Sequence, residues 1–410
     1  MRVIRFPSAA VVGRLARRDR ARDPDVQRGA RRIVRDVRRR GDAAVEAWMR
    51  RLDGIVPPFE VSGRELRDGW ARTPRDVRAA IKLAVRHVER VARAQVPRPF
   101  RVDVTDGVVV EQRVRPIARV GCYAPGGRYP LPSTVLMTVT PARVAGVRDI
   151  VLACPRPDAV VLCAALEAGA TQVLHLGGAQ AIAALAYGTA SIARVDKIVG
   201  PGSAWVAAAK TIVSADCAID FHAGPSEVVV LAADGRPDWI AADLIAQAEH
   251  DPDARAILVT PSAALAARVR DEVKRRVGRS HPAAPALARN GAIVIARSRL
   301  AAIGIVNRLA PEHLVCDAAD APQCDAAGTI FTGAWTVPAL GDYCTGSNHV
   351  LPTGGTARFR GGLSAADFVR TFTVQRTSRK GLRRLAPAAI ALARAEGLHG
   401  HATSIEVRQP

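Results

Sequence analysis

The stretch Gln172-Val-Leu-His-Leu-Gly-Gly-Ala-Gln-Ala-Ile-Ala-Ala-Leu185 combines two kinds of local pattern. An apolar run of strand length, 172–176, meets the pair Gly177-Gly178, and an alanine-rich run of helical character follows. A glycine turn between a strand and a helix is typical of α/β folds, in which helices pack on a parallel sheet. The absence of a GxGxxG pattern favours close helix–strand packing over a dinucleotide fingerprint at these glycines.

The same alternation continues on both sides of this stretch. We expect strands at 150–154, 195–199, 227–232, 256–260, 292–296 and 329–332. We expect helices at 158–168, up to 213 after Gly200-Pro-Gly202, and at 237–250, 263–276, 300–309 and 382–396. Two successive α/β units follow from this pattern. A length of 410 residues also exceeds one ordinary core, so two or more domains are expected.

Composition and cysteine usage indicate a soluble protein of the cytoplasm. Apolar residues make up 49% of the chain, and the first residues lack the apolar segment of a secretory signal. The charge-free run 168–193 contains four glycines as well as the polar residues Gln172, His175 and Gln180, so we interpret it as strand, turn and helix rather than a membrane span. Seven scattered cysteines without a CxxC motif predict reduced thiols.

The net charge of +21 comes mainly from arginine, which supplies 54 of the 59 basic residues. Between residues 26 and 53 the apolar side chains recur at helical intervals, so the arginines there are expected on solvated helix faces. Aromatic residues are only 4% of the chain, and no stacking motif interleaves with the charge. We therefore expect no specific nucleic-acid partner, although a positive field should attract an anionic dinucleotide.

Gln247 and His250 provide the first indication of a metal site. Their spacing of three residues places both on one helix face, where both can reach a single ion. An isolated pair of this kind is usually only a polar pair at a helix end. Here further polar segments follow along the chain: Pro311-Glu312-His313, Gly341-Asp342-Tyr343, Asn348-His349 and Glu396 to His401.

Taken in order, these segments resemble the histidinol dehydrogenases. The resemblance runs from about Val114 to Arg408. It rests on nine segments: Val114-Arg-Pro-Ile, Tyr123-Ala-Pro-Gly-Gly127, Gly177 to Leu185, Asp196-Lys-Ile-Val-Gly-Pro-Gly202, Ala223-Gly-Pro-Ser-Glu227, Gln247-Ala-Glu-His250, Ala310-Pro-Glu-His-Leu314, Asn348-His-Val-Leu-Pro-Thr353 and Glu396-Gly-Leu398.

The resemblance implies an architecture that periodicity alone does not reveal. It implies an α/β fold of two incomplete Rossmann-like domains, one inserted in the other, with short terminal arms in an intertwined homodimer. Mapped onto this chain, the parts would be an N-terminal arm at 1–19, a split domain at 20–122 and 226–363, an inserted domain at 123–225, and a helical C-terminal segment at 364–410. That last segment would complete the partner subunit's site.

The resemblance also implies the reaction: oxidation of L-histidinol to L-histidine through L-histidinal, in which two NAD+ are reduced in succession. It implies one zinc ion per subunit. The zinc ligands would be Gln247, His250, Asp342 and His401, a mixed oxygen and nitrogen set that suits zinc, with His401 coming from the other subunit. His313 would be the base toward the alcohol and Glu312 would activate water. Substrate recognition would add Ser226, His349 and Glu396 to His313 and the ligands.

NAD+ contacts implied by the resemblance are Tyr123, Gln180 and Ser203. Ser203 stands where the family usually has asparagine, so we expect cofactor binding weaker by ~1 kcal/mol. Ala246 stands where the family commonly has serine. One alternative is a paralogous NAD-dependent dehydrogenase acting on another small polar alcohol, such as a sulfonated propanediol. A second is a non-catalytic nucleic-acid-binding protein on the same fold; the complete set of metal and catalytic residues favours an enzyme for histidinol.

Overall fold

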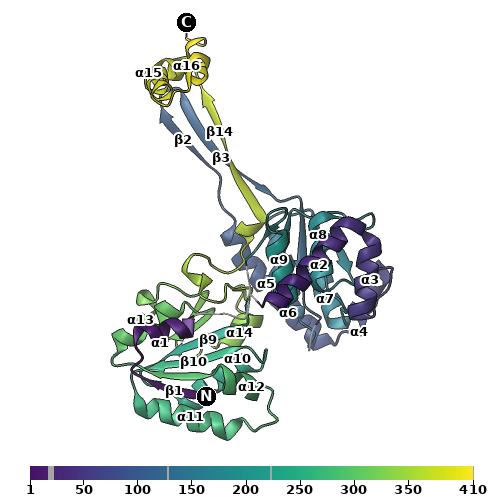
Figure 1. The fold of residues 1–410 in the computed structure, drawn as a ribbon, viewed down its shortest axis with the longest axis vertical. Coiled ribbons are helices and arrows are strands. Elements are labelled where there is room, and N and C mark those ends of the chain that lie inside the picture. The colour runs from purple at the N-terminus through teal and green to yellow at the C-terminus, as the bar shows by residue number, and fades with distance from the viewer. Residues whose placement is uncertain (17–22, 127–128, 222–223, 410) are drawn as a thin grey trace.

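The computed structural model describes residues 1–16, 23–126, 129–221 and 224–409. Gly127 and Ala223 of the quoted segments, and residues 17–19 of the expected N-terminal arm, lie outside these ranges. Two parallel sheets and one antiparallel sheet organise the described chain (Figure 1).

The six-stranded parallel sheet has the order β1-β11-β10-β9-β12-β13. Helices α10, α11 and α12 cover one of its faces, and α1 and α13 cover the other. Its strands are β1 (Arg2–Arg5), β9 (Glu227–Leu231), β10 (Arg255–Thr260), β11 (Ala292–Ile295), β12 (His313–Cys316) and β13 (Thr329–Thr332). Its helices are α1 (Ala9–Ala16), α10 (Pro237–Ala248), α11 (Ala263–Arg276), α12 (Ala284–Arg289) and α13 (Arg299–Leu309).

The five-stranded parallel sheet has the order β6-β5-β4-β7-β8. Helices α2, α3, α8 and α9 pack on one face, whereas α5, α6 and α7 pack on the other and α4 lies against α7. Its strands are β4 (Arg119–Tyr123), β5 (Asp149–Ala153), β6 (Gln172–Leu174), β7 (Lys197–Val199) and β8 (Ala218–Ile219). Its helices are α2 (Pro24–Arg40), α3 (Asp42–Asp53), α4 (Gly63–Arg72), α5 (Arg75–Gln95), α6 (Pro132–Val144), α7 (Ala159–Ala168), α8 (Gly178–Tyr187) and α9 (Ala204–Val213).

Both parallel sheets share one topology. Counted from β4, the smaller sheet has the strand order 3-2-1-4-5, and the larger sheet repeats this order from β9 with β1 added at its edge. This is the order of a doubly wound sheet: successive strands are added on one side of the first strand, and from the fourth strand onward they are added on its other side. The reversal lies between β4 and β7 in one sheet and between β9 and β12 in the other.

The packing divides the chain at different points from those expected. Residues 1–16 are not a separate arm, because β1 pairs with β11 and α1 packs under α13. Residues 24–95 pack on the five-stranded sheet and not on the six-stranded sheet formed mainly by 226–363; the apolar stripe of α2 lies against α8 and α9, while α5 lies against α6. The chain therefore leaves the six-stranded sheet after α1 and returns at β9, so the insertion is longer than the expected 123–225.

A three-stranded antiparallel sheet projects from the body and carries α15 and α16 at its far end (Figure 1). Its order is β14-β3-β2, and its elements are β2 (Phe100–Thr105), β3 (Val108–Pro116), β14 (Val369–Thr377), α15 (Arg379–Ala395) and α16 (His399–Glu406). The expectation of a helical segment over 364–410 is wrong for β14. Its sequence, Val-Arg-Thr-Phe-Thr-Val-Gln-Arg-Thr, is rich in β-branched residues, which suit a strand.

The segment between the larger sheet and the arm contains short elements: α14 (Pro338–Tyr343), η3 (Thr356–Arg358) and η4 (Ala365–Phe368), with η2 (Ala321–Gln323) preceding β13. All seven cysteines are free thiols, as expected, and six of them are buried. Across the described ranges, no helix combines the length and apolar character needed to cross a membrane.

Candidate active site

Polar side chains gather at the amino ends of β9 and β12, beside the reversal point of the six-stranded sheet. Glu227 begins β9 and His313 begins β12, which lies next to β9 in the sheet. Helix α10 runs back from β9 toward this edge and brings Gln247 with it. Ligands of doubly wound sheets usually bind at the opposite, carboxyl edge. The use of the amino edge was not predicted.

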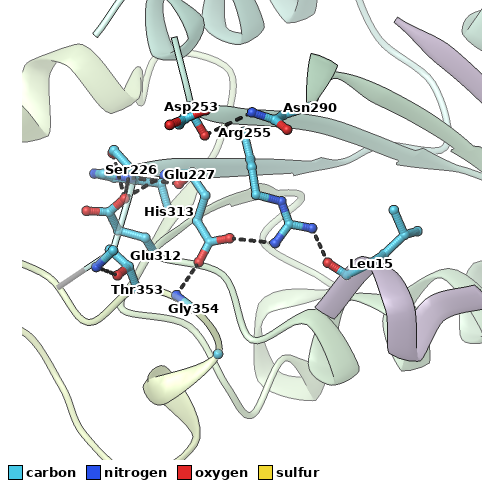
Figure 2. Close-up of polar contacts among 12 residues, drawn as sticks. Leu15, Ser226, Glu227, Asp253, Arg255, Asn290, Glu312, His313, Thr353 and Gly354 are labelled. Carbon is cyan, nitrogen blue, oxygen red and sulfur yellow. Dashed lines mark hydrogen bonds and ion pairs between the residues drawn. The ribbon is translucent and has the colours of Figure 1, made fainter. Parts of the chain in front are cut away.

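The Glu312 carboxylate is buried and held by two donors (Figure 2). Ser226 Oγ donates to Glu312 Oε2 at 2.6 Å, and the Glu227 backbone N–H donates to the same oxygen at 2.7 Å. Ser226 Oγ in turn accepts from Gln247 Nε2 at 2.5 Å. Among the described residues the hydrogen bonds and the ion pair of the Glu312 carboxylate all use Oε2, so Oε1 is the oxygen that can act on a ligand.

Glu227 is a structural centre of the site that the sequence did not single out. Its buried carboxylate lies 3.4 Å from Arg255 Nη1 and accepts from the Gly354 backbone N–H at 3.0 Å. Arg255 also donates to the Leu15 carbonyl, which ties α1 to the same network (Figure 2). A glutamate at the start of a strand that continues with four apolar residues was the available signal.

His313 lies between two carboxylates. Its Nδ1 is 3.6 Å from Glu312 Oε2, and its Nε2 is 3.7 Å from Asp342 Oδ1. Burial alone would lower the pKa of His313, but Glu312 and Asp342 outweigh burial and raise it to about 10. Burial would likewise raise the pKa of Asp342, yet the neighbouring histidines, His313 first, hold it below its usual value.

His349 completes this group from the segment that follows α14. Its Nδ1 lies 2.8 Å from the Asp342 carbonyl oxygen. Burial lowers the pKa of the His349 imidazole, against the opposing effect of Asp342. The structure therefore places near one another six of the residues that the resemblance implied: Ser226, Gln247, Glu312, His313, Asp342 and His349.

Three of the four expected metal ligands lie near one another. The side-chain Nε2 of Gln247 donates to Ser226, which leaves the side-chain oxygen Oε1 for a cation. His250 follows α10, and its Nδ1 lies 3.3 Å from the backbone carbonyl oxygen of Gln247. His250 also helps to lower the pKa of Asp342 by its charge. Within the described part of this chain, no three His, Cys, Asp or Glu side chains are grouped as a metal site. Glutamine lies outside those residue types, so His250, Asp342 and Gln247 fit zinc as an incomplete set.

The structure does not bring Glu396 and His401 to this group. Glu396 ends α15 and His401 lies in α16, both exposed at the far end of the projecting arm (Figure 1). Within one chain they therefore cannot contact Asp342. His399, two residues from His401, is exposed as well.

The expected NAD+ contacts lie at the carboxyl edge of the five-stranded sheet. Tyr123 ends β4, Gln180 is in the first turn of α8, and Ser203 precedes α9. Tyr123 and Gln180 are buried: Tyr123 Oη accepts from the Gly178 N–H at 3.1 Å, and Gln180 Nε2 donates to Asp53 Oδ2 at 3.1 Å. Of the three, Ser203 alone is exposed, and its hydroxyl caps no backbone N–H of α9.

A buried ion pair holds the loop before α9 against β4. Lys210 and Asp220 have side chains only 3% and 1% exposed. Asp220 accepts from the Gly200 N–H at 2.8 Å, and Lys210 Nζ donates to the Gly200 carbonyl at 2.9 Å. Gly200 has φ +112°, and a Cβ there would lie 2.2 Å from the Tyr123 carbonyl oxygen, so only glycine fits. The loop thus closes one side of the β4–β7 reversal point.

Comparisons with known proteins agree with this arrangement. The family model described as histidinol dehydrogenase matches residues 16–409. A histidinol dehydrogenase of Vibrio parahaemolyticus is 43% identical over 389 residues, covering 92% of this chain and 90% of that protein. One of Gluconobacter oxydans is 45% identical over 395 residues, covering 92% and 91%.

A solved structure gives the same result for the fold. The crystal structure of histidinol dehydrogenase from Elizabethkingia anophelis superposes with a TM-score of 0.94 at 32% identity, covering 100% of this chain and 98% of that one. The match includes the projecting arm, since it extends over the whole chain. The chain therefore belongs to the histidinol dehydrogenase family, whose members are NAD-dependent oxidoreductases.

Proposed function

We propose that this protein oxidises L-histidinol to L-histidine through L-histidinal. One L-histidinol, two NAD+ and one water give one L-histidine, two NADH and three protons. The observation that carries this proposal is the buried Glu312 carboxylate, held by Ser226 and the Glu227 N–H beside His313 and Asp342. Family membership supports the choice of substrate.

Two side chains divide the proton transfers. His313 would accept the hydroxyl proton as hydride leaves the carbinol carbon. With a pKa of about 10, raised by Glu312 and by Asp342, His313 holds its own proton at neutral pH, so this role requires that part of this negative charge be offset. A cation bound by Asp342 would do so and lower the pKa of His313. Glu312, with Oε1 uncommitted, would take the proton of the water that attacks the aldehyde.

We infer that Gln247, His250 and Asp342 hold zinc together with His401 of the partner subunit. Zinc would supply Lewis-acid anchoring of the substrate amine and imidazole without changing its oxidation state. His250→Ala should abolish tight zinc binding, measured by metal analysis after dialysis. His399→Ala is the control, because His399 lies in α16 only two residues from His401 but outside the proposed ligand set. Equal zinc content in wild type and His250→Ala would contradict the assignment of His250 as a zinc ligand.

The exposed apolar side chains support a shared site in a homodimer. Around α14 the side chains of Trp335, Leu340 and Tyr343 are 82%, 47% and 56% exposed. At the arm's end Leu392 is 66% exposed, close in sequence to His401. Apolar groups exposed on both surfaces support the proposal that one covers the other between two copies. This arrangement would bring His401 to the incomplete ligand set.

A charge on the arm tests the dimer. Leu392→Asp should yield monomers by light scattering and lose zinc together with the dimer. Leu300→Asp changes an equally exposed leucine of α13 in the body and should stay dimeric. A dimeric Leu392→Asp protein with full zinc content would contradict the arm-to-body contact.

NAD+ would bind at the β4–β7 reversal point, as in other doubly wound sheets, and accept the hydride. The N-terminus of α9, with exposed Ser203, would face the pyrophosphate. Tyr123 and Gln180, both buried, would support the loops of this site rather than offer open side chains.

The reaction itself is tested by stoichiometry. Zinc-loaded protein is incubated with L-histidinol and NAD+, and NADH is counted per histidine released. Two NADH per histidine are expected. Stoichiometric zinc without any NADH would instead favour a paralogous dehydrogenase of another polar alcohol, to be identified by a screen that includes sulfonated propanediols.

A further inference from the structure

A proline inside the buried helix α6 leaves one backbone carbonyl without its helical partner. Pro141 has no N–H, so the carbonyl of Met137, four residues earlier, receives no helical hydrogen bond from it. Met137 and Pro141 are both buried, so water cannot easily supply the missing donor. A buried carbonyl of this kind needs a partner from elsewhere in the chain.

Asn348 supplies that partner from the other parallel-sheet unit. Its Nδ2 donates to the Met137 carbonyl at 2.7 Å, and its Oδ1 accepts from the Val350 N–H at 2.9 Å. The Asn348 residue is only 9% exposed. Both ends of its amide are therefore used, one on α6 and one on its own segment, and the amide cannot rotate without losing both bonds.

These two bonds bracket His349. Val350 is buried in the cluster formed by α5, α6 and α7, and its carbonyl accepts from the Leu363 N–H at 2.9 Å. The backbone on both sides of His349 is thus attached to the five-stranded unit, while the His349 ring reaches back to Asp342 in the other unit. A shift of α6 would move His349 relative to Asp342.

We propose that Asn348 is a positioning residue, which uses the carbonyl left free by Pro141 to hold His349 against the substrate site. The functional part of this statement rests on the proposed function, in which His349 contacts the substrate. Asn348 itself touches no substrate. The bond between Asn348 and α6 also joins the unit proposed to bind NAD+ to the unit that carries Glu312 and His313.

The test combines Asn348→Asp with Pro141→Ala. Aspartate keeps the oxygen that accepts from Val350 but places an oxygen against the Met137 carbonyl. We expect the KM for histidinol to rise about tenfold, equivalent to ~1.4 kcal/mol, with the KM for NAD+ changed less than twofold. The alanine of Pro141→Ala supplies a helical N–H that competes with Asn348 for the Met137 carbonyl, so this variant alone should weaken the tether, and in that background the same aspartate should raise the KM by less than a further threefold.

A matched control and a second readout separate positioning from general damage. Asn307 has the same two-sided pattern, donating to the Gln323 carbonyl at 2.8 Å and accepting from the Asp325 N–H at 3.0 Å. Asn307→Asp should leave the KM for histidinol unchanged. In spectra of histidine-labelled protein, the His349 ring signal, assigned with His349→Asn, should move in Asn348→Asp while the His281 signal stays.

Each outcome decides the matter. An unmoved His349 signal, or the same loss with and without Pro141, overturns the proposal. Equal increases in the KM for histidinol and for NAD+ also overturn it, since they indicate a general structural effect. If wild type does not oxidise histidinol, the proposed function fails, yet the shift of the His349 signal in Asn348→Asp, compared with and without Pro141, still confirms or refutes the role of Asn348.

Discussion

Replacing Lys210 by methionine should destabilise the five-stranded unit strongly. Among the described residues, Lys210 is the only side-chain cation hydrogen-bonded to Asp220, whose side chain is 1% exposed. Methionine has a similar length, so no large cavity forms. The Asp220 carboxylate keeps two backbone donors, the N–H groups of Gly200 and Phe221, at 2.8 and 2.6 Å. The Gly200 carbonyl, however, loses the Lys210 ammonium.

The expected loss of folding free energy follows from this geometry. Removing one partner of a buried ion pair costs about 3–5 kcal/mol, because the remaining charge stays buried. The two backbone donors place Lys210→Met at the lower end, at ~3 kcal/mol. For a unit of roughly 200 residues this lowers Tm by about 6–12 °C. Because Gly200 belongs to the loop before α9, the KM for NAD+ should rise as well.

Calorimetry of four proteins tests this reasoning: wild type, Lys210→Met, the double variant Lys210→Met/Asp220→Asn, and Arg236→Met. The double variant removes the buried charge and should recover a large part of the lost Tm. Arg236 pairs with Asp238 at the surface with its side chain 63% exposed, so its loss should cost under ~0.5 kcal/mol. A Tm of Lys210→Met within about 2 °C of wild type, or a double variant no better than the single, would refute the argument.

Two further predictions concern the active site and its helix. The glutamine of Glu312→Gln keeps an oxygen for Ser226 and the Glu227 N–H but cannot act as a base. The rate of histidinal oxidation should therefore fall by ~10²–10⁴-fold, and the single-turnover rate of histidinol oxidation should fall much less. Equal losses with both substrates would contradict the assignment of water activation to Glu312. Burial raises the pKa of Asp243 in α10 to about 6, from an ordinary 3.8, so the folded state prefers the neutral acid. The contribution of Asp243 to the free energy of unfolding is therefore fully present below about pH 4 and is lost as the pH rises to about 6. The asparagine of Asp243→Asn stays neutral at every pH, so this variant should gain stability over wild type above about pH 6 and match it near pH 3; denaturant melts at both pH values check this.

The alternation of strands and helices was predictable because parallel-sheet strands are continuous apolar runs. Expected strands at 150–154 and 256–260 correspond to β5 and β10, and the helix at 263–276 is α11. Strand β12 was missed since its four residues begin with His313, which follows another polar residue. The arm was missed in part because β2 and β3 are exposed strands, and β14, which pairs with β3, lies more than 250 residues later in the chain.

The site was predictable only where local geometry or resemblance supplied it. The spacing of three residues indicated that Gln247 and His250 lie close together, although α10 ends at Ala248, before the expected residue 250, and His250 follows it. The bond between Ser226 and Glu312 spans 86 residues, and only the topology of β9 and β12 brings them side by side. The partners of α2 and α5 were also unpredictable, because an apolar stripe shows that a helix packs but not on which sheet.

The two sheets share one strand order, and in the proposed function they offer opposite edges to the reaction. At the amino edge of the larger sheet, strand-start N–H groups such as that of Glu227 point outward and stabilise a buried carboxylate, which suits a base. At the carboxyl edge of the smaller sheet, the start of α9 faces outward and favours an anionic cofactor. A hydride can pass only if these two edges meet. The segment after Asp342 contacts the smaller unit through His87, whose Nδ1 lies 2.6 Å from the Cys344 carbonyl oxygen, through Asn348 on α6, and through the buried side chain of Val350. In the proposed function, such contacts between the two units hold the base relative to the cofactor.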